Sequence, residues 1–270
     1  MTRRGAALLL SLSVVCASCA KPMLKLPSGT GEAAPDAMEV IDAATAACRP
    51  VSSISLEVSV SGTIAGGRVR GRLLAGLTRA GAVRLEAVAP AGQPVFILTN
   101  GVGSVQPGAT LLLPRDNRVL ERGRFDAVLQ AVTGIPLDAP VLFSVLTGCV
   151  PSAPAGGTAL GADWRLGRAG SYDVYAHREK DGSWRLVATL SRATDSGWRA
   201  EYGDFQDGLP RSIRLVSVPP QAFNLQMALS QVELNPALGD DVFRVQIPAS
   251  AQPVALDELK TSGPLGANGR

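Results

Sequence analysis

The sequence predicts a mainly β protein, in which a strongly curved antiparallel sheet forms an incomplete β-barrel with a helical lid. Apolar and polar residues alternate with a period of two through most of residues 50–248, which is typical of strands with one buried face. Short turns with Gly, Pro or Asn separate these strands, a spacing that suits an antiparallel meander. Two segments of helical periodicity interrupt the series between residues 124 and 149. Two packed sheets are the alternative architecture.

The first expected element is a helix over residues 36–48, DAMEVIDAATAAC. Asp36 and Glu39 have the spacing of a capping box at its start. One helical face is expected to carry the side chains of Met38, Ile41, Thr45 and Cys48. This face would pack on the sheet that follows.

Strands are expected on both sides of the central helices. The first group comprises residues 52–62, 68–79, 83–90, 94–100 and 109–115. The second group comprises residues 163–168, 171–178, 183–191, 198–205, 210–218, 222–235 and 241–248, the last of which is expected to close the sheet. The predicted series is therefore long enough to curve into a half-barrel.

The two central helices are expected over residues 124–134 and 137–149. The first places apolar side chains on one face and ends at Gly134. In the second, Asp138 is a plausible N-cap, Pro140 lies in the first turn and Gly148 ends the run. These amphipathic helices would cover the hollow face of the sheet.

Arg68, Arg70 and Arg72 alternate with apolar residues along one strand. One interpretation is a basic stripe that lies near anionic lipid headgroups, where each cation contributes about 1 kcal/mol. The other is an ordinary solvated outer face, which strand alternation produces more often. The sequence leaves both interpretations open.

The N-terminus has the pattern of a bacterial lipoprotein signal. Arg3 and Arg4 precede an uncharged run from Ala6 to Val15, which is shorter than the roughly 20 residues that span a bilayer. The run leads to VVCASC, which resembles a lipobox and implies that Cys19 becomes the first mature residue and carries lipid such as palmitate. An ordinary secretory signal cut near residue 17 is the alternative. By the same resemblance, the lack of Asp after Cys19 favours an outer-membrane lipoprotein that faces the periplasm.

The remaining cysteines, Cys48 and Cys149, are a disulfide candidate, because an exported chain meets an oxidising compartment. Two buried free thiols are the alternative. The expected organisation is a signal peptide over 1–18, a flexible tether over 19–35, a single domain over 36–248 and a partly disordered tail over 249–270.

Side chains that carry chemistry are few. The chain has one histidine, His177, and no cluster with metal-ligand spacing. Neither a catalytic residue nor a metal or other cofactor is predicted, so the protein is expected not to be an enzyme. The net charge of +3 has no concentrated basic stretch, which argues against a nucleic-acid partner.

The tract from RGRLLAGLTRAG to LQAVTGIPLDAPVLFSVLTGC resembles the LolB and LolA lipoprotein-carrier superfamily. The segment LQAVTGIPLDAPVLFSVLTG is similar to the helix pair of that family, and DVFRVQIP is similar to its last strand. The resemblance implies an incomplete β-barrel with a helical lid and an apolar cavity for acyl chains. It also implies a role in outer-membrane lipoprotein localisation or lipid transfer, with a periplasmic carrier protein as a partner. A structural or assembly lipoprotein of the envelope on the same fold is the alternative.

Apolar positions on these elements define a candidate ligand site. The candidate cavity wall is Val69, Leu73, Val83, Leu85, Val95, Ile97, Leu111 and Leu113. The candidate lid is Met38, Ile41, Phe125, Leu129, Leu142, Val145 and Leu146. A filled core is the alternative for each residue, because inward strand positions have the same apolar sequence pattern in a filled core and in an open cavity.

Overall fold

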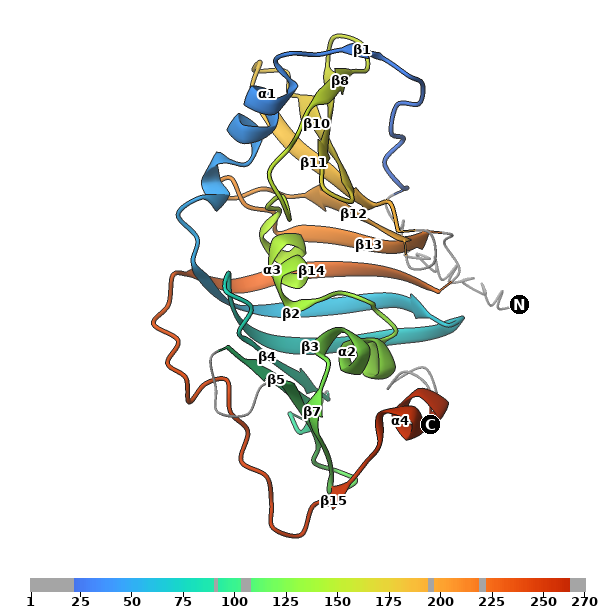
Figure 1. Ribbon diagram of the computed structural model, residues 1–270, viewed down its shortest axis with the longest axis vertical. Coiled ribbons are helices and arrows are strands. Elements are labelled where there is room, and N and C mark those ends of the chain that lie inside the picture. The colour runs from blue at the N-terminus through green and yellow to red at the C-terminus, as the bar shows by residue number, and fades with distance from the viewer. Residues whose placement is uncertain (1–21, 90–91, 103–107, 194–196, 219–221, 263–270) are drawn as a thin grey trace, which may run out of the picture.

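The computed structural model describes residues 22–89, 92–102, 108–193, 197–218 and 222–262. These residues form one continuous sheet of fifteen strands in the order β1-β8-β9-β10-β11-β12-β13-β14-β2-β3-β4-β5-β6-β7-β15 (Figure 1). All neighbours pair antiparallel except β15, which runs parallel to β7. The sheet does not close on itself, so the predicted incomplete barrel is confirmed.

The strands follow the predicted series with additions at the edges. One half of the sheet contains β2 (Ser53–Ile64), β3 (Gly67–Thr78), β4 (Val83–Val88), β5 (Pro94–Gly101), β6 (Gly108–Leu113) and β7 (Arg118–Gly123). The other half contains β8 (Gly157–Ala159), β9 (Trp164–Ala169), β10 (Tyr172–Arg178), β11 (Trp184–Ser191), β12 (Gly197–Gly203), β13 (Ser212–Val218) and β14 (Phe223–Leu234). The edge strands are β1 (Glu32–Ala33) and β15 (Gln252–Pro253). The sheet therefore extends beyond the predicted limits of 36 and 248.

Helices α2 (Phe125–Thr133) and α3 (Ala139–Thr147) lie across one face of the sheet (Figure 1). Their local signals act as predicted. Gly134 and Gly148 end the helices in the left-handed conformation, with φ of 74° and 65°, which glycine adopts without steric cost. The Asp138 carboxylate accepts a hydrogen bond of 2.7 Å from the Val141 N–H. This bond satisfies one of the unpaired donors at the start of α3.

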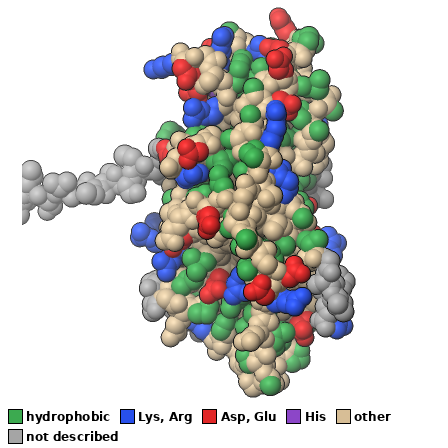
Figure 2. Space-filling model, turned by 90° about the vertical axis from the view of Figure 1, so that its left-hand side faces the viewer, with side chains coloured by type: hydrophobic (Ala, Val, Ile, Leu, Met, Phe, Trp, Pro, Cys, Tyr) green, Lys and Arg blue, Asp and Glu red, His purple; other side chains and the backbone are tan. Residues whose placement is uncertain are grey.

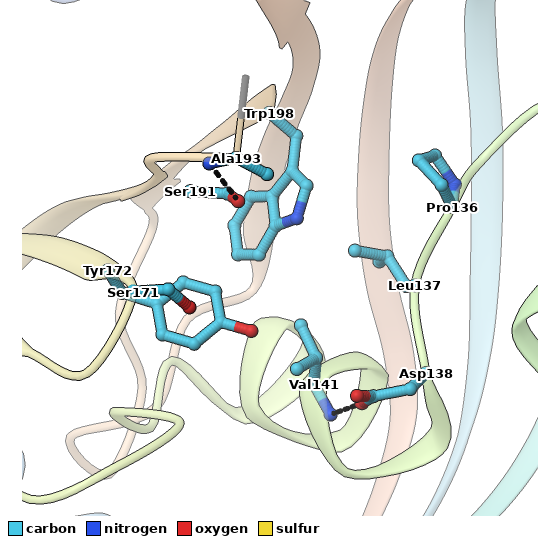
Figure 3. Close-up of a pocket in the computed structure, with 9 residues that line it drawn as sticks. All are labelled: Pro136, Leu137, Asp138, Val141, Ser171, Tyr172, Ser191, Ala193 and Trp198. Atoms are coloured by element: carbon cyan, nitrogen blue, oxygen red, sulfur yellow. Dashed lines mark hydrogen bonds between the residues drawn. The ribbon is translucent and has the colours of Figure 1, made fainter. Parts of the chain in front are cut away.

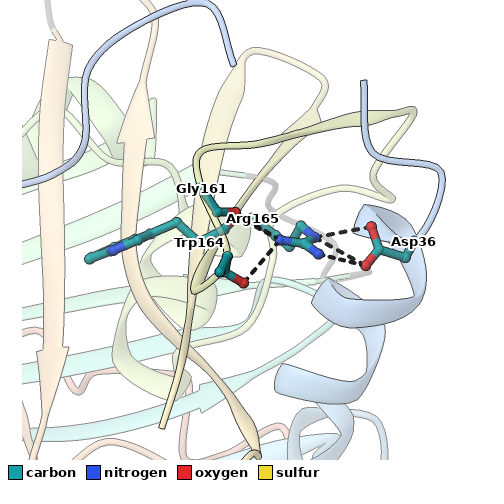
Figure 4. Close-up of polar contacts among 5 residues, drawn as sticks. Asp36, Gly161, Trp164 and Arg165 are labelled. Carbon is teal, nitrogen blue, oxygen red and sulfur yellow. Dashed lines mark hydrogen bonds and ion pairs between the residues drawn. The ribbon is translucent and has the colours of Figure 1, made fainter. Parts of the chain in front are cut away.

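Helix α1 (Ala37–Ala44) and a short 3-10 helix (Ala46–Cys48) lie over the β8–β11 end of the sheet (Figure 1). The prediction of a capping box at the start of α1 was wrong. Asp36 makes no side-chain capping bond, because its backbone is already helical rather than extended. Its carboxylate binds the guanidinium of Arg165 on β9 instead, with distances of 3.0 Å to Nε and 2.9 Å to Nη2 (Figure 4). This pair lowers the pKa of the Asp36 carboxyl and joins the start of α1 to β9.

The face that carries the helices, here called the inner face, holds the main core. Its fully buried side chains include Ile41, Leu77, Leu98, Leu111 and Phe143. A disulfide joins Cys48 to Cys149, with 5.6 Å between their Cα atoms, which confirms the predicted bridge. It connects the end of the α1 segment to the residue that follows α3 and Gly148.

The predicted strand over 241–248 was wrong. After β14 the chain makes turns and irregular structure along the opposite, outer face of the sheet. There, Arg84 Nη1 donates to the carbonyl oxygens of Val242, at 3.3 Å, and Arg244, at 3.2 Å. A new strand needs an unpaired sheet edge, and β15 occupies the edge beside β7.

The two ends of the described chain both pack on the body. In the expected C-terminal tail, α4 (Leu256–Ser262) packs against α2 and buries Leu259 in the core (Figure 1). Arg118 and Glu258 form an ion pair of 2.6 Å that ties this helix to β7. In the expected tether, the backbone of Leu24 bonds to side chains of β12, and Glu32 and Ala33 pair with β8.

Candidate functional site

A pocket of about 170 Å³ opens where the connection between α2 and α3 meets β10, β11 and β12 (Figure 3). Pro136, Leu137, Asp138, Val141, Ser171, Tyr172, Ser191, Ala193 and Trp198 line it. Leu137 and Trp198 are almost fully buried, at 1% and 3% exposure. Leu137 and Trp198 belong to the apolar core, so the pocket borders that core.

Aromatic rings form the sheet side of this pocket. The centroids of the Tyr172 and Trp198 rings lie 5.8 Å apart with planes tilted by 42°, within the range of a favourable aromatic pair. Burial raises the pKa of the Tyr172 hydroxyl, an interaction with the Ser171 side chain offsets part of this rise, and the charge of Asp138 adds to it. Tyr172 therefore stays neutral at physiological pH and offers a hydroxyl to the pocket.

The helix side of the pocket is held by the start of α3. Asp138 directs its carboxylate to the Val141 N–H, and this bond fixes the first turn of the helix (Figure 3). Leu137 and Val141 point from this turn towards the aromatic pair (Figure 3). Ligand pockets usually enclose about 300–1,000 Å³, so this pocket must expand before it can admit a long ligand.

Most of the predicted cavity wall forms filled core. Val83, Leu85, Leu111 and Leu113 are buried in the cluster on the inner face, and Val69 and Leu73 pack against it half-buried. The predictions for Val95 and Ile97 were wrong. In β5, Phe96 and Leu98 face the core. Val95 and Ile97 alternate with them along the strand and therefore lie on the outer face.

All but one of the predicted lid residues lie in or against the core of the inner face. The core contains Ile41, Phe125, Leu129, Val145 and Leu146, and Leu142 packs against it half-buried. The prediction for Met38 was wrong, because α1 buries Ala37, Val40 and Ile41 and leaves Met38 47% exposed. None of the predicted wall or lid residues lines the pocket.

Sequence reasoning missed the pocket-lining residues Leu137, Val141, Tyr172 and Trp198. Leu137 stands between a proline and an N-cap residue, outside any periodic pattern. Tyr172 is the first residue of β10 and Trp198 is the second of β12. Alternation places both on the inner face, ahead of Val174 and Ala200. The alternation could have assigned them to this face, but not to a common pocket.

Cys16, Cys19 and the expected signal peptide lie outside the described residues. No helix among the described residues is both long enough and apolar enough to cross a bilayer. Within the same residues, no group of three His, Cys, Asp or Glu side chains is arranged to hold a metal ion. Acidic and basic side chains are interspersed on the side of the molecule shown in Figure 2.

Comparisons with known proteins support the fold. Neither the protein-family models nor the curated proteins give a match. A LolA superfamily protein from Nitrosomonas europaea superposes with a TM-score of 0.51 at 9% identity, over 79% of this chain and 98% of that one. A DUF1329 family protein from Desulfovibrio piger superposes with a TM-score of 0.48 at 13% identity, over the same 79% and 98%. The chain thus has the LolA-like open β-barrel fold, and the predicted structural resemblance is confirmed.

Proposed function

We propose that this protein is a membrane-anchored lipoprotein that binds acyl chains beneath α2 and α3. Its role would be outer-membrane lipoprotein localisation or lipid transfer, in exchange with a periplasmic carrier protein. The observation that carries the proposal is the construction of the inner face. There, an open sheet lined with apolar side chains is covered by two short helices, and a pocket opens at the connection between them.

The disulfide determines which part of the cover can move. Cys149 follows α3 directly and is bonded to Cys48, so the C-terminal end of α3 is fixed to the body. The connection over 134–138 has no such crosslink and begins at Gly134, whose left-handed backbone tolerates rearrangement. The α2–α3 connection is therefore the part that lifts, and it lines the pocket.

An acyl chain can supply the free energy for this opening. Each buried methylene contributes about 0.8 kcal/mol, so about ten methylenes contribute about 8 kcal/mol. Exposing a buried leucine or valine costs about 1.5–3 kcal/mol. A ligand that replaces Leu137 and Val141 in contact with the core can therefore offset the cost of lifting them. Such binding needs no catalytic residue, so we propose a carrier and not an enzyme.

Anchoring completes the proposal. Cys19 would carry the lipid and hold the protein on the periplasmic side of the outer membrane. More than one acyl chain on this cysteine would make the attachment stable, since one chain is only a marginal anchor.

Native mass spectrometry of the mature chain, released from membranes in mild detergent, tests the proposal. We expect added masses that match fatty acid, phospholipid or acylated peptide. Leu137→Trp should reduce uptake of a fluorescent fatty acid, because the larger ring fills the pocket. Met38→Trp on the exposed side of α1 is the matched control and should leave uptake unchanged.

One observation favours the alternative, a structural or assembly lipoprotein of the envelope. The inner positions of β4 and β6 are filled core in this structure. That alternative predicts a clean ligand-free mass and no fatty-acid uptake by the wild type. Both results together would exclude the carrier.

A further inference from the structure

The basic stripe on β3 lies on the outer face of the sheet. Val69 and Leu73 pack towards the core, so Arg68, Arg70 and Arg72 point to the other side. Arg72 pairs with Glu57 at 3.5 Å. Arg68 and Arg70 are exposed, and neither has a carboxylate within ion-pair distance among the described residues. Two cations at this end of β3 are therefore available to an external anion.

The N-terminal segment is fastened to the same face. The Leu24 N–H donates to both carboxylate oxygens of Glu201, each at 3.2 Å, and the Leu24 carbonyl accepts from Arg199 Nη2. Arg199 and Glu201 form an ion pair of 2.5 Å with side chains only 13% and 11% exposed. This shielded pair, here called the Leu24 clamp, fixes the point at which the chain leaves the body. From there the segment rises beside the sheet to β1 (Figure 1).

Strand register relates the clamp to the stripe. Arg70 is in register with Ser61, then Gln226, Arg214 and finally Glu201. This row crosses from β3 to β12 in four steps of about 4.8 Å, which places the clamp about 19 Å from the stripe. Both therefore belong to one continuous part of the outer face.

We propose that this outer face docks on an anionic bilayer surface, with Arg68 and Arg70 at the lipid headgroups. The inference rests on the proposed anchor at Cys19. Leu24 lies five residues after Cys19, so the clamp can stand at most about 18 Å from the lipidated residue. An anchor this short on the outer face brings that face to the membrane and leaves the helices of the inner face turned away.

The charges of this surface favour a bilayer. The acidic side chains nearest the stripe are engaged internally, Glu57 by Arg72 and Glu86 by Arg84 at 3.2 Å. Lys25, next to the clamp, is exposed and adds a further cation. Cations close to an anionic leaflet strengthen binding by about fivefold each. Arg68 and Arg70 together should therefore shift the docking equilibrium by about 25-fold.

Fluorescence quenching on vesicles tests this orientation with the full mature lipidated chain. A fluorophore on Ser61→Cys reports the outer face beside Arg70, and one on Met38→Cys reports the opposite side. Each protein is reconstituted in phosphatidylcholine vesicles whose headgroups carry a quencher. The vesicles are prepared with or without about 30 mol % phosphatidylglycerol. We expect stronger quenching at Ser61→Cys than at Met38→Cys, and only in the anionic vesicles. About 1 M salt should abolish it, because the Debye length falls to about 3 Å.

The charge variants make the test specific. Arg68→Gln with Arg70→Gln should reduce the docked-to-undocked ratio about 25-fold. Arg178→Gln at the end of β10, combined with Lys180→Gln in the turn that follows, removes the same charge from exposed positions and should leave quenching unchanged. Thermal unfolding of each variant checks that the fold is intact.

Flotation separates this proposal from the one on which it rests. Flotation with neutral vesicles in about 1 M salt reports the lipid anchor alone. If the protein floats but the two labels are quenched equally, the proposed docking surface is wrong and the lipid anchor is retained. The same holds if both charge variants lose quenching. Failure to float would overturn the anchor, and the docking proposal with it.

Discussion

Replacing Cys48 and Cys149 together by alanine is expected to destabilise the folded chain by about 4–5 kcal/mol. The two residues are 101 positions apart in sequence. Closing a loop of about 100 residues removes about 4.7 kcal/mol of chain entropy from the unfolded state at 25 °C. Both cysteines are buried, so the lost sulfur contacts add to this figure. The bridge is the only covalent tie between the α1 segment and the end of α3 within the described residues.

Urea unfolding followed by tryptophan fluorescence measures this effect, since Trp198 is buried beside the helices. With a denaturant slope of up to about 3 kcal/mol/M, the midpoint should fall by about 1.5 M or more. Wild-type protein treated with a phosphine reductant should fall by a similar amount, while the double variant should not respond to the reductant. A change of less than about 1 kcal/mol in the double variant would refute the reasoning that this bridge restricts the unfolded chain.

Three further outcomes are expected. Asp138→Ala should cost about 1 kcal/mol in chemical unfolding, because α3 loses its N-cap bond; an unchanged midpoint would contradict that role. The Arg118 ion pair lowers the pKa of Glu258 below its ordinary 4.5, so α4 is stabilised above about pH 4.5 and loses this support as the pH falls through the lower folded value. Hydrogen exchange in α4 should then accelerate on acidification in the wild type but much less in Glu258→Gln, and equal acceleration in both would count against the pair. Leu85→Trp should destabilise by about 1–3 kcal/mol through overpacking of a filled core. Leu74→Trp, 41% exposed on the outer face, should change stability by less than about 0.5 kcal/mol. Small effects at both positions would indicate an open cavity.

Local signals in the sequence determined helices α1, α2 and α3 and the existence of most strands, but not α4, which lies in the expected C-terminal tail. Asp138 and the two glycines that end α2 and α3 act through atoms within a few residues of themselves, so they could be read without the fold. Alternation likewise placed β2, β3 and β14, because each carries a clear polar face. The disulfide followed from the expected compartment and from the small number of remaining cysteines.

Other features could not be decided locally. Val95 to Leu98 are all apolar, so period-two alternation gives no preference for either face of β5. The pairing of Leu85 with Leu98 decides it and turns Ile97 outwards. The segment over 241–248 alternates like a strand, yet a strand also requires a free edge, and none remains beside β7 because β15 occupies it.

The sequence by itself thus determined a curved antiparallel sheet with two covering helices, because turns, caps and alternation depend on neighbours along the chain. Only the tertiary structure decided that Leu85 and Leu111 lie in filled core, and that Leu137, Tyr172 and Trp198 meet at a pocket. The physical reason is that packing and cavities depend on side chains brought together from distant strands. The same holds for the Leu24 clamp and Arg70, which share one face only because strand register aligns them across five strands.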